Sequence, residues 1–346
     1  MLLLSENVFL DTEVFVAKNF DFSSHKFELL QAAIARGNLF IYLTDIVVRE
    51  TEKHIVDAVR IARRSLSSTK TDYRILEVCK HFHEAVNDSK FETYEKEILQ
   101  SFRDFRSKFV KEVIHITHVP IEDLMDCYFQ EKPPFNKETK KHEFPDALSL
   151  AEIIQWAKEN RATAAVVSND SDIPSLISSL QAGDFLFHYN TIEQLLDSLS
   201  ATEEKKEQLS KSIQEHYTKL HEELRSVFSD ACFHPRGYDA EVVDQELLSA
   251  QITEINFLEV REDYALSECE FDCEYRLEIE YDDPDAVFWD SEDKMAYCFN
   301  RKRKSKVFTA LFYLEVELSK EEGGEEWSVD LISNHISRNV DFDPWE

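Results

Sequence analysis

Short runs of apolar residues alternate with longer helical patterns through the first 200 residues of the chain. A strand buried on both faces is a short continuous apolar run, and a covering helix repeats its apolar positions every three or four residues. The alternation therefore predicts an α/β fold, in which helices cover a parallel sheet. The predicted strands are Asn7 to Asp11, Leu39 to Thr44, Ala162 to Val167 and Phe185 to Tyr189.

A long, mainly helical insertion separates the second predicted strand from the third. Helical spacing extends over residues 45–66, 71–85, 91–111 and 121–129, and a loop with two prolines follows. We expect this insertion to form a cap or lid on the sheet.

The carboxyl-terminal part changes from a helical to a β pattern. Apolar positions from Thr191 to about Ala231 recur at helical spacing and predict one long helix that leaves the first domain. Beyond Asp244 the period becomes two, as in the stretch Tyr275 to Tyr281, and predicts a small antiparallel β domain. The expected parts are a first domain over residues 1–200, a connecting helix and linker over 201–246, and a β domain over 247–346.

The chain is strongly acidic. Its 39 Lys and Arg against 69 Asp and Glu give a formal net charge of -30. This charge repels nucleic acid over most of the surface and keeps the chain away from anionic membranes, so a polyanionic ligand must enter at a local exception. Residues 251–346 hold 10 Lys and Arg against 26 Asp and Glu, so more than half of the excess acid lies in the β domain.

Glycine and cysteine usage excludes several classes of protein. The five glycines cannot form a GxGxxG loop or a phosphate-binding P-loop, which excludes Rossmann dehydrogenases and P-loop ATPases. The six cysteines form no repeated CxxC pair, which indicates free thiols in a reducing compartment and predicts a cytoplasmic location. The first residues lack the basic region of a signal peptide, and no apolar run is long enough for a membrane helix.

Acidic residues gather at one edge of the predicted sheet. In a parallel α/β sheet, the carboxyl ends of the strands and the amino ends of the following helices lie at the same edge. Each acid alone is also explained as a helix cap, a turn or a solvated helix face. Together they cannot all stay ionised without cations, and Mg²⁺ or Mn²⁺ suits an all-oxygen cluster. The candidate ligands are Asp11, Glu50, Asp146, Asp170 and Asp172.

Four motifs around these acids resemble, in order, those of the PIN-domain ribonucleases. They are VFLDT with Asp11 and Thr12, VVRETEKHI with Glu50, FPDALSLA with Asp146, and VVSNDSDI with Ser168, Asp170 and Asp172. The resemblance covers roughly residues 5 to 200, and the long insertion is similar to that of the larger stand-alone bacterial members. It implies a PIN-like three-layer α/β/α sandwich with a parallel central sheet and a helical insertion.

The resemblance also implies a chemistry. The acids of the four motifs would hold one or two Mg²⁺ or Mn²⁺ ions, with Asp172 as an accessory ligand. The metals would lower the pKa of a water and stabilise the charge at the scissile phosphate, so no side-chain nucleophile is required. Thr12 and Ser168 would orient carboxylates or water through their hydroxyls.

Basic clusters offer local tracks for a phosphate backbone. The dense run from Arg301 to Lys306 is expected at a hairpin tip, where it contacts RNA or an acidic partner, or serves as a solvated turn that blocks aggregation. The candidate nucleic-acid contacts are Arg60, Arg63, Arg64, Arg103 and Arg106 on the insertion, and Arg301 and Arg303 in the β domain.

We therefore expect a metal-dependent endoribonuclease, for which the resemblance alone suggests a toxin or phage-defence role. The alternatives are a structure-specific DNA nuclease and a catalytically inactive PIN-fold module that binds RNA or protein. The expected partners are an RNA substrate and either another protein or a second copy of the chain. A protein partner would bind through the 191–231 helix or the β domain.

Overall fold

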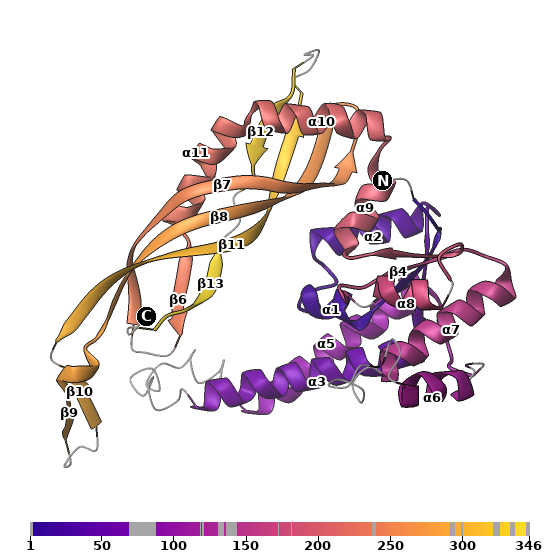
Figure 1. Cartoon of the computed structure of the whole chain (residues 1–346), viewed down its shortest axis with the longest axis horizontal. Helices are drawn as coiled ribbons and strands as arrows, with labels where there is room; N and C mark the ends of the chain where they lie inside the picture. Colours follow the sequence, from indigo (N-terminus) through magenta and orange to yellow (C-terminus); the bar gives the residue numbers. More distant parts are fainter. Residues whose placement is uncertain are drawn as a thin grey trace. The chain divides into compact units, whose positions relative to one another are not determined.

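The computed structural model divides the chain into two compact units, Met1–Leu199 and Ser200–Glu346 (Figure 1). The residues that it describes are 3–68, 88–117, 119, 121–130, 135, 144–171, 173–180, 182–236, 240–290, 295–298, 300–320, 326–332 and 336–343.

The first unit is built on a parallel sheet that has five strands in the described part of the chain. The order across the sheet is β3-β2-β1-β4-β5, so β1 has β2 on one side and β4 on the other. Such a reversal of strand order is a switch point, and ligands of open α/β sheets bind outside the carboxyl ends of the strands there. The strands are β1 Asn7–Leu10, β2 Phe40–Thr44, β3 Val110–Ile114, β4 Ala164–Val167 and β5 Leu186–Tyr189.

Helices cover both faces of this sheet, which confirms the expected three-layer α/β/α architecture. Val8 and Leu10 of β1 point to one face and Phe9 to the other, because side chains alternate along a strand. One face packs against α1 Thr12–Ala17, α2 His25–Ala35, α3 Asp45–Ser68, α5 Asp88–Phe109 and α9 Ile192–Ser200. The other packs against α7 Phe144–Asn160 and α8 Ile173–Ser179, and α6 Ile121–Gln130 packs beside the start of α7.

The insertion contributes to both the helical layer and the sheet. The sequence predicts a helix over residues 91–111, but α5 ends at Phe109 and the next residues form the edge strand β3. This strand has no continuous apolar run, because Lys111 and Glu112 point to solvent at the edge. The end of α5 is anchored by Phe102, whose ring lies 5.5 Å from that of the buried Phe15. The predicted helix over 71–85 and the proline loop lie outside the described residues.

A buried carboxylate ties α9 to the amino-terminal helices. Glu193 is 3% exposed and forms ion pairs with Lys18 and, at 2.8 Å, with Lys26. Burial alone raises the pKa of this carboxyl, but the two lysine charges outweigh burial and lower the pKa to about 2. Removing one member of such a buried ion-pair cluster leaves the charge of the others uncompensated, which is strongly destabilising.

Replacing Glu193 with Gln should destabilise the first unit by about 3 kcal/mol at neutral pH. The folded-state pKa lies below the ordinary value of 4.5, so the carboxylate's contribution is complete above that pH and is lost as the pH falls towards 2. Urea unfolding followed by hydrogen exchange of the first unit's sheet, at about pH 7, 5 and 3.5, measures this contribution. The exposed Glu28→Gln is the control, and a stability gap that widens towards acid pH would contradict the assignment.

The second unit is an antiparallel sheet with a helical layer, and the predicted β domain is thereby confirmed. Helices α10 Glu203–Glu215 and α11 Tyr217–Ser229 lie along one face of a sheet with the order β12-β11-β8-β7 (Figure 1). The sheet strands are β7 Ala240–Val260, β8 Tyr264–Asp282, β11 Arg301–Ser319 and β12 Ser328–Leu331. Smaller elements are the parallel pair β6 Cys232–Arg236 and β13 Ser337–Asp341, and the hairpin β9 Val287–Asp290 and β10 Met295–Cys298.

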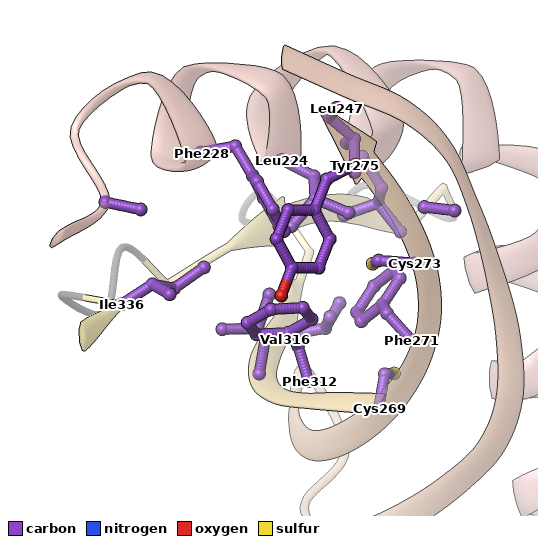
Figure 2. Packing of buried hydrophobic residues seen from close by; sticks show 14 of the residues in the cluster. Leu224, Phe228, Leu247, Cys269, Phe271, Cys273, Tyr275, Phe312, Val316 and Ile336 are labelled. Carbon is purple, nitrogen blue, oxygen red and sulfur yellow. The ribbon is translucent and has the colours of Figure 1, made fainter. Parts of the chain in front are cut away.

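The predicted single helix over 191–231 is three helices, which belong to different cores. Leu195 of α9 is buried in the first unit, whereas Leu209 of α10 and Phe228 of α11 are buried in the second. The Phe228 ring packs 5.0 Å from that of Phe312 on β11, and Figure 2 shows it beside Tyr275 of β8. Continuous helical spacing hides the breaks because it does not distinguish one helix from several in succession.

Candidate metal centre

Asp11 lies at the switch point of the first unit's sheet, between the carboxyl ends of β1 and β4. Its backbone N–H donates to the carbonyl of Val167 at 3.0 Å, which fixes it against β4. It is also the N-cap of α1, because its carboxylate accepts from the Thr12 N–H at 2.7 Å. The hydroxyl of Ser168 donates to the other carboxylate oxygen at 2.7 Å. Contacts from the end of β4, from the residue that follows it and from the start of α1 thus fix the position of Asp11.

A pocket opens beside Asp11 and brings together three of the predicted acids. Asp11, Asp146 at the start of α7 and Asp170 after β4 all line it. These positions are far apart in the sequence, and the parallel sheet places them at one edge. The floor is apolar and includes Phe9, Leu150 and Val166. The structure therefore brings these three of the predicted acids to one pocket.

Glu50 is connected to this group of acids through Thr12, the residue after Asp11. The Thr12 side chain donates to the Glu50 carboxylate at 3.2 Å, which connects α3 to α1. Glu50 itself is absent from the described lining of the pocket. The Ser168 hydroxyl also accepts from the Asp170 N–H at 3.1 Å, so this one serine holds both Asp11 and the loop that carries Asp170. Asp172 lies outside the described residues.

The electrostatics of the pocket favour an incoming cation. Burial raises the pKa of the Asp11 carboxyl, against hydrogen bonds from Ser168 and Thr12, and the charge of Asp170 adds to the rise. Burial also raises the pKa of Glu50, and the charge of Asp11 adds to that rise. Carboxylates that raise one another's pKa are held in their ionised form by an opposite charge.

The donor atoms fit a hard divalent ion by their chemistry. The polar side chains of the pocket are carboxylates and hydroxyls, which are the oxygen ligands that Mg²⁺ and Mn²⁺ prefer. Within the described residues, no three His, Cys, Asp or Glu side chains already lie close enough to share one ion.

Two hydroxyl residues of the pocket were missed by sequence reasoning. Thr44 ends β2 and Ser149 lies on α7, and their hydroxyl oxygens are 2.9 Å apart at the pocket wall. The signal was present, because Thr44 occupies the same strand-end position as Asp11 and Ser149 follows Asp146 by one helical turn. His188 of β5, also unpredicted, lies with Nε2 2.7 Å from the carbonyl oxygen of Ser168.

The predicted basic contacts of the insertion lie on α3 and α5. Arg60 is exposed and pairs with Asp57 one turn earlier at 2.7 Å, and Arg103 of α5 pairs with Glu52 of α3 at 3.2 Å. Arg63 and Arg64 are exposed on α3, and Arg106 is half-buried on α5. The two helices pack together, so these five arginines share one helical pair.

The expected hairpin tip at Arg301 to Lys306 is wrong. These residues form the first part of β11 and pair in register with β8, so that Arg301 faces Asp282 and Lys306 faces Leu277. Arg301 pairs with Glu280 at 3.3 Å and also with Glu241, and Arg303 pairs with Glu280 at 3.0 Å. A dense basic run is compatible with a strand here because acidic side chains on the neighbouring strands balance it.

Comparison with known proteins adds a family to this geometry. Residues 8–173 match the family model described as PIN domain. Searches of the curated proteins and of the solved structures found no significant match. In the part of the chain that the structure describes, no helix is long and apolar enough to span a membrane.

Proposed function

Because the first unit of this chain belongs to the PIN-domain family, we propose that the chain is a metal-dependent endoribonuclease whose active site is the Asp11 pocket. PIN domains are generally nucleases that act on nucleic acids, and they typically use divalent metal ions. The observation that carries the proposal is the meeting of Asp11, Asp146 and Asp170 in one pocket at the switch point of the sheet.

In this proposal the pocket's carboxylates hold one or two Mg²⁺ or Mn²⁺ ions. Asp11, Asp146 and Asp170 are the principal ligands, and Glu50 and Asp172 complete the set. A bound ion supplies a water of lowered pKa and neutralises charge at the scissile phosphate. The chain supplies the positions of the ligands.

Positioning is the role of the hydroxyls. Ser168 and the Thr12 N–H hold the Asp11 carboxylate from two sides, at 2.7 Å each, so its oxygens keep one orientation. The Thr12 hydroxyl orients Glu50 at 3.2 Å. Hydrogen-bonded neighbours of this kind fix ligand geometry and typically matter tenfold to about a hundredfold for metal affinity or activity.

The α3 and α5 helical pair is proposed to receive the RNA backbone. Its arginines offer positive charge in a chain whose net charge is -30, and phosphate contacts dominate the affinity for nucleic acid. Arg60 and Arg103 already pair with acids on the same two helices, and a phosphate would compete for these side chains. Arg301 and Arg303 are bound to acids of their own sheet, so we place them second as RNA contacts.

The substrate class is tested by offering the full chain three labelled substrates of equal length in Mn²⁺: single-stranded RNA, single-stranded DNA and duplex DNA. The proposal predicts internal cuts in RNA at a much higher rate than in either DNA. Preferential cutting of DNA would favour the DNA nuclease instead. Binding of RNA without cutting, in both Mn²⁺ and Mg²⁺, would favour an inactive binding module.

Replacing Arg60, Arg63 and Arg64 with Ala should weaken RNA binding to a similar degree for all sequences. The slope of the logarithm of the binding constant against the logarithm of the salt concentration should become less steep, by up to roughly 0.7 per lost phosphate contact. Titrations of labelled single-stranded RNA at several salt concentrations measure both effects. Lys211, Arg225 and Arg236 are exposed on the second unit, and their triple Ala variant is the charge-matched control. Equal losses of RNA affinity in the two variants would mean that the three arginines of α3 belong to a solvated helix face and do not bind RNA specifically.

A further inference from the structure

The sheet of the second unit has one covered and one open face. Alternate residues of β8, from Ala265 to Tyr281, are buried beneath the helices and the β6 and β13 pair. The residues between them point the other way; Asp272, Glu274 and Arg276 are exposed, and Glu278 is half-buried. Pairing in register continues this open face onto β7 and β11.

Negative charge covers the middle of this open face, which we call the acidic face. Five of its seven acids are exposed, and Glu270 and Glu278 are half-buried. On the same stretch of β7 and β8 the register places one basic side chain, Arg276, which pairs with Glu246 at 2.8 Å. The acids are Asp244, Glu246 and Glu254 of β7 and Glu270, Asp272, Glu274 and Glu278 of β8.

The arrangement of these acids opposes the stability of the sheet itself. Asp244 stands opposite Glu278, and Glu254 opposite Glu270, in the register of the two strands. Like charges directly opposite each other on a sheet are destabilising. Opposed acids of this kind are expected where they bind another molecule, because positive charges on that molecule would relieve the repulsion.

The chain balances the same type of charge a few residues away. At the start of β11, Arg301 and Arg303 pair with Glu280, and Arg301 also pairs with Glu241. Further along the open face of β11, however, the residues that stand opposite these acids and Arg276 carry no charge. They are Ser305, Val307, Thr309, Leu311 and Tyr313.

Three of these residues form an exposed apolar stripe beside the acids. Val307, Leu311 and Tyr313 are 47%, 43% and 56% exposed, and Leu311 and Tyr313 face Asp272 and Glu270. Partial burial and hydrogen bonding to Glu270, with further nearby carboxylates, raise the pKa of Tyr313 to about 12. Large apolar side chains grouped on an open sheet face mark a contact surface more often than singly scattered ones do.

We propose that the acidic face and its apolar stripe dock a lysine- or arginine-rich segment of another protein that also carries apolar side chains. Charge complementarity selects this occupant, because nucleic acid is repelled by the acids. A second copy would meet the face with the same acids, since a two-fold contact places one surface patch on itself. The apolar stripe adds the desolvated contact that charge alone does not supply.

The proposal does not depend on nuclease activity and is tested on the full chain by fluorescence anisotropy. The probe is a labelled ten-residue peptide that alternates Lys and Leu, and its comparison alternates Lys and Ser. The triple variant Asp272→Asn, Glu274→Gln, Glu278→Gln should weaken Lys-Leu binding roughly tenfold, if each ion pair with the peptide contributes about 0.5 kcal/mol. The stripe variant Leu311→Ser, Tyr313→Ser should weaken it about fivefold.

The control removes the same charge from exposed helix positions of the same unit, through Glu204→Gln, Glu207→Gln and Glu222→Gln. It should bind the peptide as the parent chain does. Equal losses in the two triple variants, or equal binding of the two peptides by the parent chain, would mean general attraction to a polyanion and overturn the proposal. If the parent chain self-associates in sedimentation and the face variant does not, the occupant of the face is a second copy of the chain and not a basic partner. The face variant should unfold at the same or a higher temperature, because it relieves repulsion.

Discussion

Replacing Asp11 with Asn is expected to lower the rate of RNA cleavage by roughly a thousandfold or more, because the metal loses a ligand worth several kcal/mol of charge stabilisation in the transition state. The folded protein should be equally stable or more stable. Burial and neighbouring charge raise the pKa of this carboxyl, which means that its ionised form is disfavoured in the folded state at neutral pH. Single-turnover cleavage of a labelled RNA and thermal unfolding of the same samples measure the two effects.

The matched control is Asp184→Asn. Asp184 is exposed and precedes β5, so it lies at the amino edge of the sheet, opposite the pocket. The chemical change is the same, and activity should stay at the parent level. An Asp11→Asn variant that cuts RNA at the control's rate would remove the pocket as the active site. If the variant lost both activity and its folded structure, Asp170→Asn would be the variant to test next.

Mn²⁺ is expected to stabilise the first unit strongly, and Asp146→Asn should abolish most of this effect. At about a hundred times its dissociation constant, a ligand specific for the folded state adds about 2.7 kcal/mol. For a unit of this size that is a rise of roughly 5 to 10 °C in the unfolding midpoint. Asp146 lines the pocket from α7, whereas Asp11 lies at the start of α1, so this variant separates binding in the pocket from binding to Asp11 alone.

A general effect of divalent cations on an acidic chain is distinguished in the same scans. Asp184→Asn should keep the full midpoint rise, and the cleavage rate of Asp146→Asn should fall together with its Mn²⁺ stabilisation. If Asp146→Asn kept the whole rise, the ion would bind elsewhere and this acid would not be a ligand.

The sheet of the first unit was predictable where its strands are buried on both faces. β1, β2 and β4 are short apolar runs of this kind, and β5, at one edge of the sheet and partly buried, is also a short, mainly apolar run. β3 was not predictable in this way, because an edge strand exposes Lys111 and Glu112 and its pattern continues that of the preceding helix. Whether such a segment forms a strand depends on its neighbours in space more than on its own sequence.

In the β domain, too, some strand segments were predictable from the sequence and others were not. The period of two predicted β8 and the later part of β11, because one face of each is buried. The run Arg301 to Lys306 suggested a turn, because the acids that balance it belong to β7 and β8. Such cross-strand ion pairs depend on register, which a single sequence does not reveal.

The candidate site was predictable as far as strand-end logic reaches. That logic places Asp11, Ser168 and Asp170 together, because they follow neighbouring strands of one sheet. It does not reveal that Thr12 connects Glu50 to the group, or that Thr44 and Ser149 form a hydroxyl pair in the wall. These contacts depend on side-chain directions, which follow only from the packing of α3 and α7 on the sheet.

The most direct test of the central claim is a Mn²⁺ titration of RNA cleavage by the metal-stripped full chain. Single-stranded RNA is incubated with the protein in EDTA, and free Mn²⁺ is then raised stepwise while the rate is followed. The Asp11 pocket predicts no cleavage in EDTA and a saturable recovery that Asp184→Asn shares and Asp11→Asn lacks. Full cleavage in EDTA, or an identical recovery in Asp11→Asn, would contradict a metal-dependent nuclease centred on this pocket.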